Sequence, residues 1–308
     1  MSAMRKRIVV TGREGQVVTS LIERGVLDNR FEVIAIGRPH LDLSQPDTID
    51  SALRAAEPDL IVSAAAYTAV DQAETDEVAA AIVNGASAGA IANTATSLDI
   101  PIVHVSTDYV FDGSKMSPYV EADPVAPIGA YGRSKLAGEQ AVIHAAPNHV
   151  ILRTAWVYSP FSKNFLKTML RLAETRDSLN VVDDQIGNPT SALDIADGIL
   201  AIAANLLKSD DPGLRGVFHM TGSGEATWAD FAVEIFAASA RQGGPSAIVE
   251  RIPSSAYPTL AKRPANSRLD CGLLAGRHGV RLPDWKWSTT NTVERLVPIR
   301  QLTKTKGI

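Results

Sequence analysis

Short apolar, β-branched runs alternate with longer amphipathic segments along the first half of the chain. Such runs are typical of strands buried on both faces of a parallel sheet. Between them, segments rich in Ala, Leu and Glu predict helices, among them residues 77–97 and 130–145. The predicted strands lie at residues 7–11, 31–36, 60–65, 102–105 and 149–158. This alternation predicts an α/β fold with a doubly wound parallel sheet of the Rossmann type.

The pattern changes after about residue 159. Helices predicted at 164–176, 194–207 and 228–240 and a short strand at 217–221 are separated by polar or irregular stretches at 181–190 and 257–269. We therefore predict a dinucleotide-binding Rossmann lobe over residues 1–158, completed by about 180–220. A smaller C-terminal α/β substrate lobe is predicted over 159–179 and 221–308, interleaved with the first.

Composition narrows the class of protein. The 308 residues are 45% hydrophobic and 21% charged, which suffices for a sizeable core. A net charge of -4 with scattered Lys and Arg favours a small-molecule partner over nucleic acid. The single cysteine, Cys271, excludes an intrachain disulfide and fits a reducing compartment. We expect no signal peptide and no segment of the ~18 apolar residues that span a membrane, hence a cytoplasmic protein.

The first predicted strand runs into a glycine turn. Gly12 and Gly15 form a Gly-x-x-Gly before a helix, which indicates a pyrophosphate site, although plain turns share this pattern. Val18 stands where a third glycine would let helix and strand pack closely. Arg38 ends the second strand; it favours NADPH by accommodating a 2′-phosphate, but NADH and a solvated turn arginine stay open. Asp42 fits either the adenine end of a cofactor or a turn.

Tyr131 and Lys135 are the candidate proton-transfer pair. Residues four apart on the predicted helix share one face, although such a pair is also typical of a solvated face. A cation beside a phenol lowers its pKa, at about 1.4 kcal/mol per unit. Thr107 follows the strand at 102–105, at the edge where open α/β sheets bind ligands, and is the candidate third member.

With these residues in place, the chain resembles the extended short-chain dehydrogenase/reductase family. Within that family it is similar to reductases of nucleotide-linked 4-keto-6-deoxy sugars, over nearly its whole length. The segments that carry the likeness are 65–71 (AAYTAVD), 106–111 (STDYVF), 153–158 (RTAWVY), 184–190 (DQIGNPT) and 263–269 (RPANSRL).

The resemblance implies NAD(P)H-dependent reduction of a 4-keto-6-deoxyhexose carried on dTDP, with the sugar nucleotide in the C-terminal lobe. The implied catalytic residues are Thr107, Tyr131 and Lys135. The implied substrate contacts are Thr107, Asp108 and Trp156. The implied cofactor contacts are Gly15, Gln16, Val17, Asp42, Leu43, Ala66, Tyr67, Thr68, Tyr131 and Lys135, to which the reasoning above adds Gly12 and Arg38.

Three further expectations follow from the family. Some members dimerise around magnesium held by glutamates; the corresponding residues here are Ser20 and Leu193, so we expect no metal, while a homodimer stays open. The related 4,6-dehydratases need an acidic pair after the Thr. Thr107 is followed by Asp108 and Tyr109, so one of the two acids is missing and the sequence disfavours a dehydratase. The remaining rival is a non-catalytic regulatory subunit of the methionine adenosyltransferase type, which Val18 favours and the intact Thr, Tyr and Lys oppose.

Overall fold

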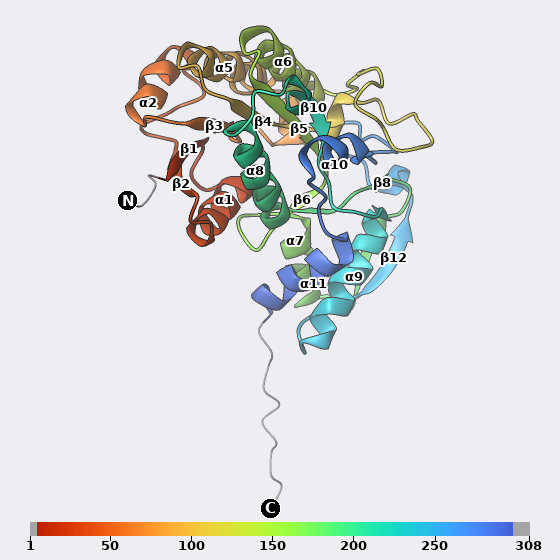
Figure 1. Ribbon diagram of the computed structural model, residues 1–308. Helices are drawn as coiled ribbons and strands as arrows, with labels where there is room; N and C mark the ends of the chain where they lie inside the picture. The colour runs from red at the N-terminus through yellow and green to blue at the C-terminus, as the bar shows by residue number, and fades with distance from the viewer. Residues whose placement is uncertain (1–4, 298–308) are drawn as a thin grey trace, which may run out of the picture.

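The computed structural model describes residues 5–297 and is built around one six-stranded parallel sheet (Figure 1). Its order is β10-β5-β4-β3-β1-β2. The strands are β1 (Lys6–Thr11), β2 (Phe31–Ile36), β3 (Leu60–Ser63), β4 (Ile102–Thr107), β5 (His149–Thr154) and β10 (Gly216–His219). The chain leaves β1 for β2 on one side and returns to β3 on the other, which makes the β1/β3 border a topological switch point.

Helices cover both faces of the sheet. Ile8 and Val10 pack into the core under α1 (Gln16–Leu27) and α8 (Ala192–Leu206), whereas Val9 packs into the core on the other side. That second side is covered by α2 (Ile49–Ala55), α5 (Ser87–Ser97) and α6 (Ala130–Ala145). Both faces are therefore buried, which explains the unbroken apolar strands. The predicted doubly wound sheet is confirmed.

A second core forms the smaller α/β lobe at the bottom of Figure 1. Tyr158 and Phe231 are among its buried aromatic residues. Helix α9 (Trp228–Arg241) begins with a capping box in which the Thr227 hydroxyl and the Asp230 carboxylate each accept a backbone N–H. The elements of the smaller lobe are α7 (Phe165–Ala173), β7 (Ser178–Val182), α9 (Trp228–Arg241), β12 (Ile248–Ile252) and α11 (Trp285–Leu296). Residues 1–4 and 298–308 of the predicted lobes lie outside the described residues.

Short elements join the two cores. β6 (Val157–Tyr158) pairs in parallel with β9 (Thr190–Ser191), and β8 (Ile186–Gly187) pairs in antiparallel fashion with β11 (Ala226–Thr227). α10 (Gly272–His278) covers β10. The strand predicted over 149–158 is thus wrong in one respect: it stops at Thr154, and Trp156 turns the chain with a left-handed φ of 48° before β6 begins.

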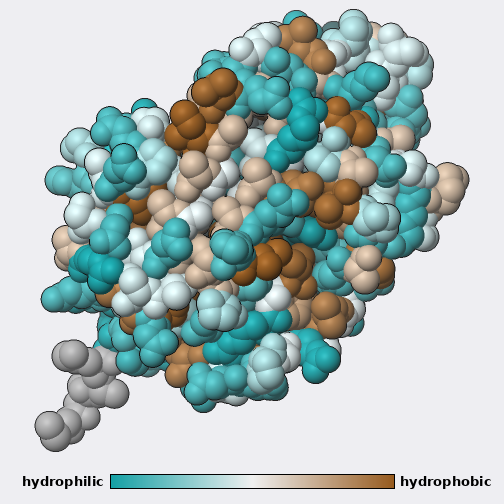
Figure 2. All heavy atoms as spheres, turned by 90° about the horizontal axis from the view of Figure 1, so that it is seen from above, coloured by the Kyte–Doolittle hydropathy of each residue, from teal (hydrophilic) through white to brown (hydrophobic). Residues whose placement is uncertain are grey.

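The helix predicted over 77–97 is present but contains a π-turn. The turn η2 (Ile82–Ala86) separates α4 (Glu77–Ala81) from α5. Contrary to our expectation, this run is long and apolar enough to cross a membrane by length and composition, with a mean hydropathy of 1.2. Half of it is buried and it packs along α6, as a core helix does. The face seen from above in Figure 2 shows separate hydrophobic patches among hydrophilic residues.

Candidate active site

Thr107, Asp108 and Tyr131 meet at the carboxyl edge of the sheet. Thr107 ends β4 beside Thr154 at the end of β5, and Tyr131 lies in the first turn of α6. The Thr107 hydroxyl donates to Asp108 Oδ1 at 3.0 Å and accepts from Tyr109 N at 3.2 Å. The Tyr131 ring packs edge-on against Tyr109, with 5.5 Å between centroids. The structure thus brings the predicted catalytic Thr and Tyr to the same edge of the sheet.

Burial sets the protonation of this group. It raises the pKa of Tyr131 above its ordinary value, and the neighbouring Asp108 carboxylate raises it further. Burial also raises the pKa of Asp108 to about 6, although the Thr107 hydroxyl donates to Oδ1 of its carboxylate. Tyr131 is therefore a phenol throughout the neutral range, which suits an acid rather than a base.

Lys135 follows one turn later but turns its ammonium inward. It is 3% exposed, and Nζ donates to the Val105 carbonyl at 2.7 Å and lies 3.5 Å from His104 Nε2. Burial lowers the pKa of Lys135 to about 8. We expected this cation to lower the pKa of Tyr131; that expectation is wrong for this structure, because burial and Asp108 raise it.

A polar layer beneath the site was missed by sequence reasoning. Glu139, one turn after Lys135, accepts from Ser106 Oγ at 2.5 Å and from Arg153 Nη2 at 2.7 Å. His104 Nδ1 lies 3.0 Å from Ser63 Oγ. All these residues are almost fully buried. Their signal in the sequence was a charged or hydroxyl residue inside an apolar strand or helix, but their partners lie far away along the chain.

The glycine turn has the geometry that a pyrophosphate needs. Gly12 has a φ of 106°, and a Cβ there would come within 3.1 Å of the Val18 side chain and 3.3 Å of Ala65. Gly15 precedes α1 without any side-chain cap, so the first N–H groups of the helix, including those of Gln16 and Val17, stay available for an anion. Val18 is 2% exposed and fills the space that a third glycine would leave.

The Gln16 side chain points away from a cofactor. Its Oε1 accepts from Ser159 Oγ at 2.8 Å and from Asn164 Nδ2 at 2.9 Å, and its Nε2 donates to the Val157 carbonyl at 3.3 Å. Ser162 Oγ donates to the Glu14 carbonyl at 2.6 Å. Only the backbone of Gln16 is therefore free to contact a phosphate, and its side chain anchors the chain that enters the second lobe.

Two arginines meet at the end of β2. Arg13 Nη1 donates to the Arg38 carbonyl at 3.3 Å, and the Arg13 side chain packs on Gly37, whose Cβ would lie 2.9 Å from Arg13 Cγ. Both side chains are exposed. Arg13 was not predicted; its place between two glycines of the turn was the available signal. This pair fits a 2′-phosphate.

The predicted contacts of the adenine and nicotinamide ends lie in two loops. The Asp42 carboxylate accepts from Ser44 N and Oγ, both at 2.9 Å, and the Leu43 carbonyl accepts from Ser87 Oγ at 2.5 Å. The next loop, which follows β3, contains Ala66, Tyr67 and Thr68.

Asn84 in the π-turn fixes this second loop. Its Oδ1 accepts from Tyr67 N at 2.8 Å, and its Nδ2 donates to the Tyr67 carbonyl at 3.1 Å and to Ser134 Oγ at 2.9 Å. Asn84 thereby joins the loop to α6, a role that was not predicted.

The remaining predicted residues occupy different surroundings. Trp156 lies just beyond β5 and stacks on Trp228, with centroids 3.7 Å apart. Ser20 and Leu193 are buried, and the Ser20 hydroxyl donates to the Gln16 carbonyl at 2.8 Å. A leucine has no donor atom, so these two residues do not fit a metal ion.

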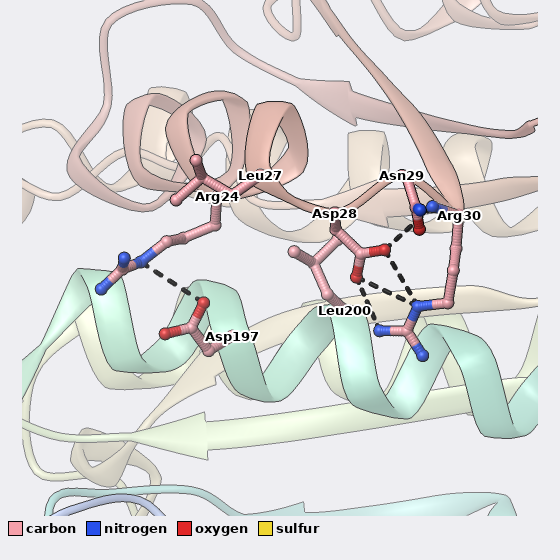
Figure 3. A pocket seen from close by; sticks show the side chains of 7 residues that line it. All are labelled: Arg24, Leu27, Asp28, Asn29, Arg30, Asp197 and Leu200. Carbon is pink, nitrogen blue, oxygen red and sulfur yellow. Dashed lines mark hydrogen bonds and ion pairs between the residues drawn. The ribbon is translucent and has the colours of Figure 1, made fainter.

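A polar pocket of about 510 Å³ lies at the opposite, amino edge of the sheet. Arg24 points to Asp197 across a 3.3 Å ion pair, and Arg30 folds onto Asp28 at 2.6 Å (Figure 3). Its charges are paired, and it lies before β2 rather than after the strands. We therefore assign the site to the carboxyl edge.

The switch-point sheet, the glycine turn and the Thr-Tyr-Lys group define the short-chain dehydrogenase/reductase class. The chain belongs to the family described as RmlD substrate binding domain, whose model matches residues 5–297. It is 50% identical over 291 residues to a dTDP-4-dehydrorhamnose reductase of Sinorhizobium fredii, covering 94% of this chain and 98% of that protein.

Two solved dTDP-4-dehydrorhamnose reductases share the fold. The structure from Clostridium acetobutylicum has a TM-score of 0.86 at 35% identity and covers 94% of this chain and 99% of its own. The structure from Bacillus anthracis, in complex with NADP, has a TM-score of 0.87 at 30% identity and covers 95% of this chain and 100% of its own.

Proposed function

We propose that this protein is an NADPH-dependent reductase that converts dTDP-4-dehydro-β-L-rhamnose to dTDP-L-rhamnose, in dTDP-rhamnose biosynthesis. The observation that carries the proposal is the half-buried Tyr131 at the carboxyl edge, with Thr107 at the end of β4 and Lys135 one turn later on α6, in a chain of the RmlD family. NADH is the alternative cofactor. A homodimer and a cytoplasmic location belong to the same proposal.

Reduction of a ketone needs a hydride and a proton. Bound NADPH supplies the hydride to C4. Tyr131 donates its proton to the C4 oxygen as negative charge develops there, and Thr107 hydrogen-bonds the same oxygen. The high pKa of the phenol keeps the proton in place until the oxygen becomes basic enough to take it. In this proposal the Lys135 ammonium leaves the Val105 carbonyl to hold the nicotinamide ribose, and Asp108 and Trp156 contact the sugar.

In this proposal each lobe binds a different molecule. The sheet with α1 and α8 binds the cofactor, with the pyrophosphate on the Gly12–Gly15 turn, the 2′-phosphate between Arg13 and Arg38, and the nicotinamide end beside residues 66–68. The core of α7, α9 and α11 binds the nucleotide sugar. Support for this division comes from the N-terminus of α1, which has no side-chain cap, and from the position of Trp156 where the chain passes between the cores.

Two alternatives are separated by assay. A reductase of another nucleotide-linked 4-keto-6-deoxy sugar would oxidise NADPH with a GDP-linked substrate in preference to the dTDP-linked one. A regulatory subunit of the methionine adenosyltransferase type would bind NADP without oxidising NADPH.

Tyr131→Phe tests the proposal. Loss of a general acid should lower turnover by a factor of about 10² to 10⁴ while NADPH still binds. The measurement is NADPH oxidation followed by absorbance with dTDP-4-dehydro-β-L-rhamnose. Tyr257→Phe, at a tyrosine that is 61% exposed, is the matched control and should keep the full rate. A near-normal rate in Tyr131→Phe would remove Tyr131 from the mechanism.

A further inference from the structure

Trp156 is held in a backbone conformation that it would not choose by itself. It is the second residue after β5, whose last residue Thr154 pairs with Thr107, so it stands at the edge that carries the reacting groups. Its φ is 48°, in the left-handed region that bulky residues rarely adopt. Packing around the indole must therefore hold this conformation.

The first support is Trp228, the first residue of α9. The two indoles stack with 3.7 Å between centroids and 8° between planes. Trp228 is itself fixed, because its Nε1 donates to Gln185 Oε1 at 3.2 Å and Gln185 Nε2 donates to Ser254 Oγ at 2.8 Å. The Phe165 ring packs on Trp228, with 4.6 Å between the ring centroids. One face of Trp156 thus rests on a rigid aromatic surface.

The second support is Gly187 in β8. A Cβ at Gly187 would lie 2.5 Å from Cε2, 2.7 Å from Nε1 and 2.8 Å from Cζ2 of Trp156. Nearly equal distances to three adjacent ring atoms place Gly187 over the ring, and none of its nearest neighbours belongs to Trp228, so it covers the opposite face. The pairing of Gly187 with Ala226 across β8 and β11 holds the two supports at a fixed spacing.

Trp228 stacks on one face of the indole and Gly187 lies over the Nε1, Cε2 and Cζ2 atoms of the other, so we infer that a ligand meets the ring at its edge. The edge of an aromatic ring is its positive rim, and in Trp it includes the N–H donor, so it suits the hydroxyl oxygens of a sugar better than its apolar face. We propose that Gly187 and Trp228 are positioning residues that clamp Trp156 edge-on to the sugar and so set the sugar specificity of the site. This inference rests on the proposed function, in which Trp156 contacts the substrate.

Gly187→Ala tests the clamp with one methyl group. Gly187 has no left-handed φ, so alanine is compatible with its backbone, but the methyl overlaps the Trp156 ring and must displace it. The KM for the dTDP-sugar should rise about 10- to 100-fold, with the Kd of NADPH unchanged. Gly276→Ala, where a Cβ meets nothing within 4 Å, is the control and should change neither constant.

Circular dichroism in the far ultraviolet, at the strong absorption band of indole, reads the clamp without turnover. Two stacked indoles should give a coupled pair of bands of opposite sign, which disappears in Trp228→Ala and in Trp156→Phe. It should persist in Trp287→Phe, at an indole that is 59% exposed. Trp228→Phe keeps an aromatic surface under Trp156 and should recover part of the affinity for the sugar nucleotide that Trp228→Ala loses.

The outcomes separate the two proposals. A normal KM in Gly187→Ala, or an equal loss of NADPH and sugar affinity, overturns the positioning role. A wild-type protein without the coupled bands overturns the clamp itself. If the wild type does not oxidise NADPH with the dTDP-sugar, the proposed function is wrong, and the coupled bands still decide whether the clamp exists.

Discussion

Glu139→Gln removes the negative charge at the centre of the polar layer beneath the active site. Glu139 and Arg153 form a pair with side chains only 2% and 6% exposed, joined at 2.7 Å. Glutamine keeps the size of the side chain but presents one oxygen where the carboxylate accepts from Arg153 Nε, Arg153 Nη2 and Ser106 Oγ. The guanidinium would then be a buried charge without a counter-charge, and its Nη1 already has no partner within the described chain.

The expected loss is large. Attraction between unit charges about 4 Å apart is worth roughly 4 kcal/mol at an effective dielectric constant of about 20. Breaking a buried pair from one side typically costs about 3–5 kcal/mol. We therefore expect the free energy of unfolding to fall by about 3–5 kcal/mol.

Urea denaturation followed by circular dichroism measures this loss. Glu77→Gln is the matched control, because Glu77 pairs with Arg133 at 3.0 Å with both side chains about half exposed, and it should cost less than about 1 kcal/mol. Adding Arg153→Met to Glu139→Gln should restore part of the free energy of unfolding, since it removes the buried guanidinium that Glu139→Gln leaves without its carboxylate partner. A loss below about 1 kcal/mol in Glu139→Gln would refute the reasoning, because the pair would then behave like the surface one.

Three further predictions concern the cofactor loop and the site. Arg38→Ala and Arg13→Ala should each raise the KM for NADPH about 10- to 100-fold and leave the KM for NADH unchanged, since a charge-assisted contact to a 2′-phosphate is lost; equal effects on both cofactors would contradict this. Asp108→Asn should stabilise the protein at pH 7 by about 3 kcal/mol, because the pKa of Asp108 rises from 3.8 to about 6 on folding and its ionised form is disfavoured there. That gain should shrink as pH falls through 6 toward 4, which urea titrations at several pH values can check. Val18→Gly should lower the free energy of unfolding by about 2–4 kcal/mol in the same assay, because the Val18 side chain is part of the hydrophobic core. It should not improve NADPH binding.

The sequence predicted the elements whose signal is local. The strand at Phe31–Ile36 and the helix at Ala130–Ala145 have the predicted bounds, because an apolar run buried on both faces and an Ala-rich segment specify their own conformations. The break at Trp156 could not be predicted, since the left-handed turn is stabilised by Gly187 and Trp228, which lie 31 and 72 residues later. The π-turn in the long helix likewise depends on packing against α6.

The candidate site shows the same limit. The spacing of Tyr131 and Lys135 and the strand end at Thr107 predicted which side chains come together at one edge. It did not predict that Lys135 would bond to the backbone of β4, or that burial would raise the pKa of the phenol. Both depend on how deeply α6 packs on the sheet, and that depth is set by residues on other elements.

The contacts of Gln16 with Val157, Ser159 and Asn164 bear on how this enzyme can be engineered. Hydrogen bonds between residues more than 140 positions apart join the turn that receives the cofactor to the segment that enters the sugar lobe. The two segments should therefore be exchanged together. Transplanting residues 12–18 from a relative without a glutamine at this place would remove the three hydrogen bonds that Gln16 makes to Val157, Ser159 and Asn164. A chimera that exchanges residues 12–18 together with 157–164 keeps those bonds, and it is the smallest exchange that respects them.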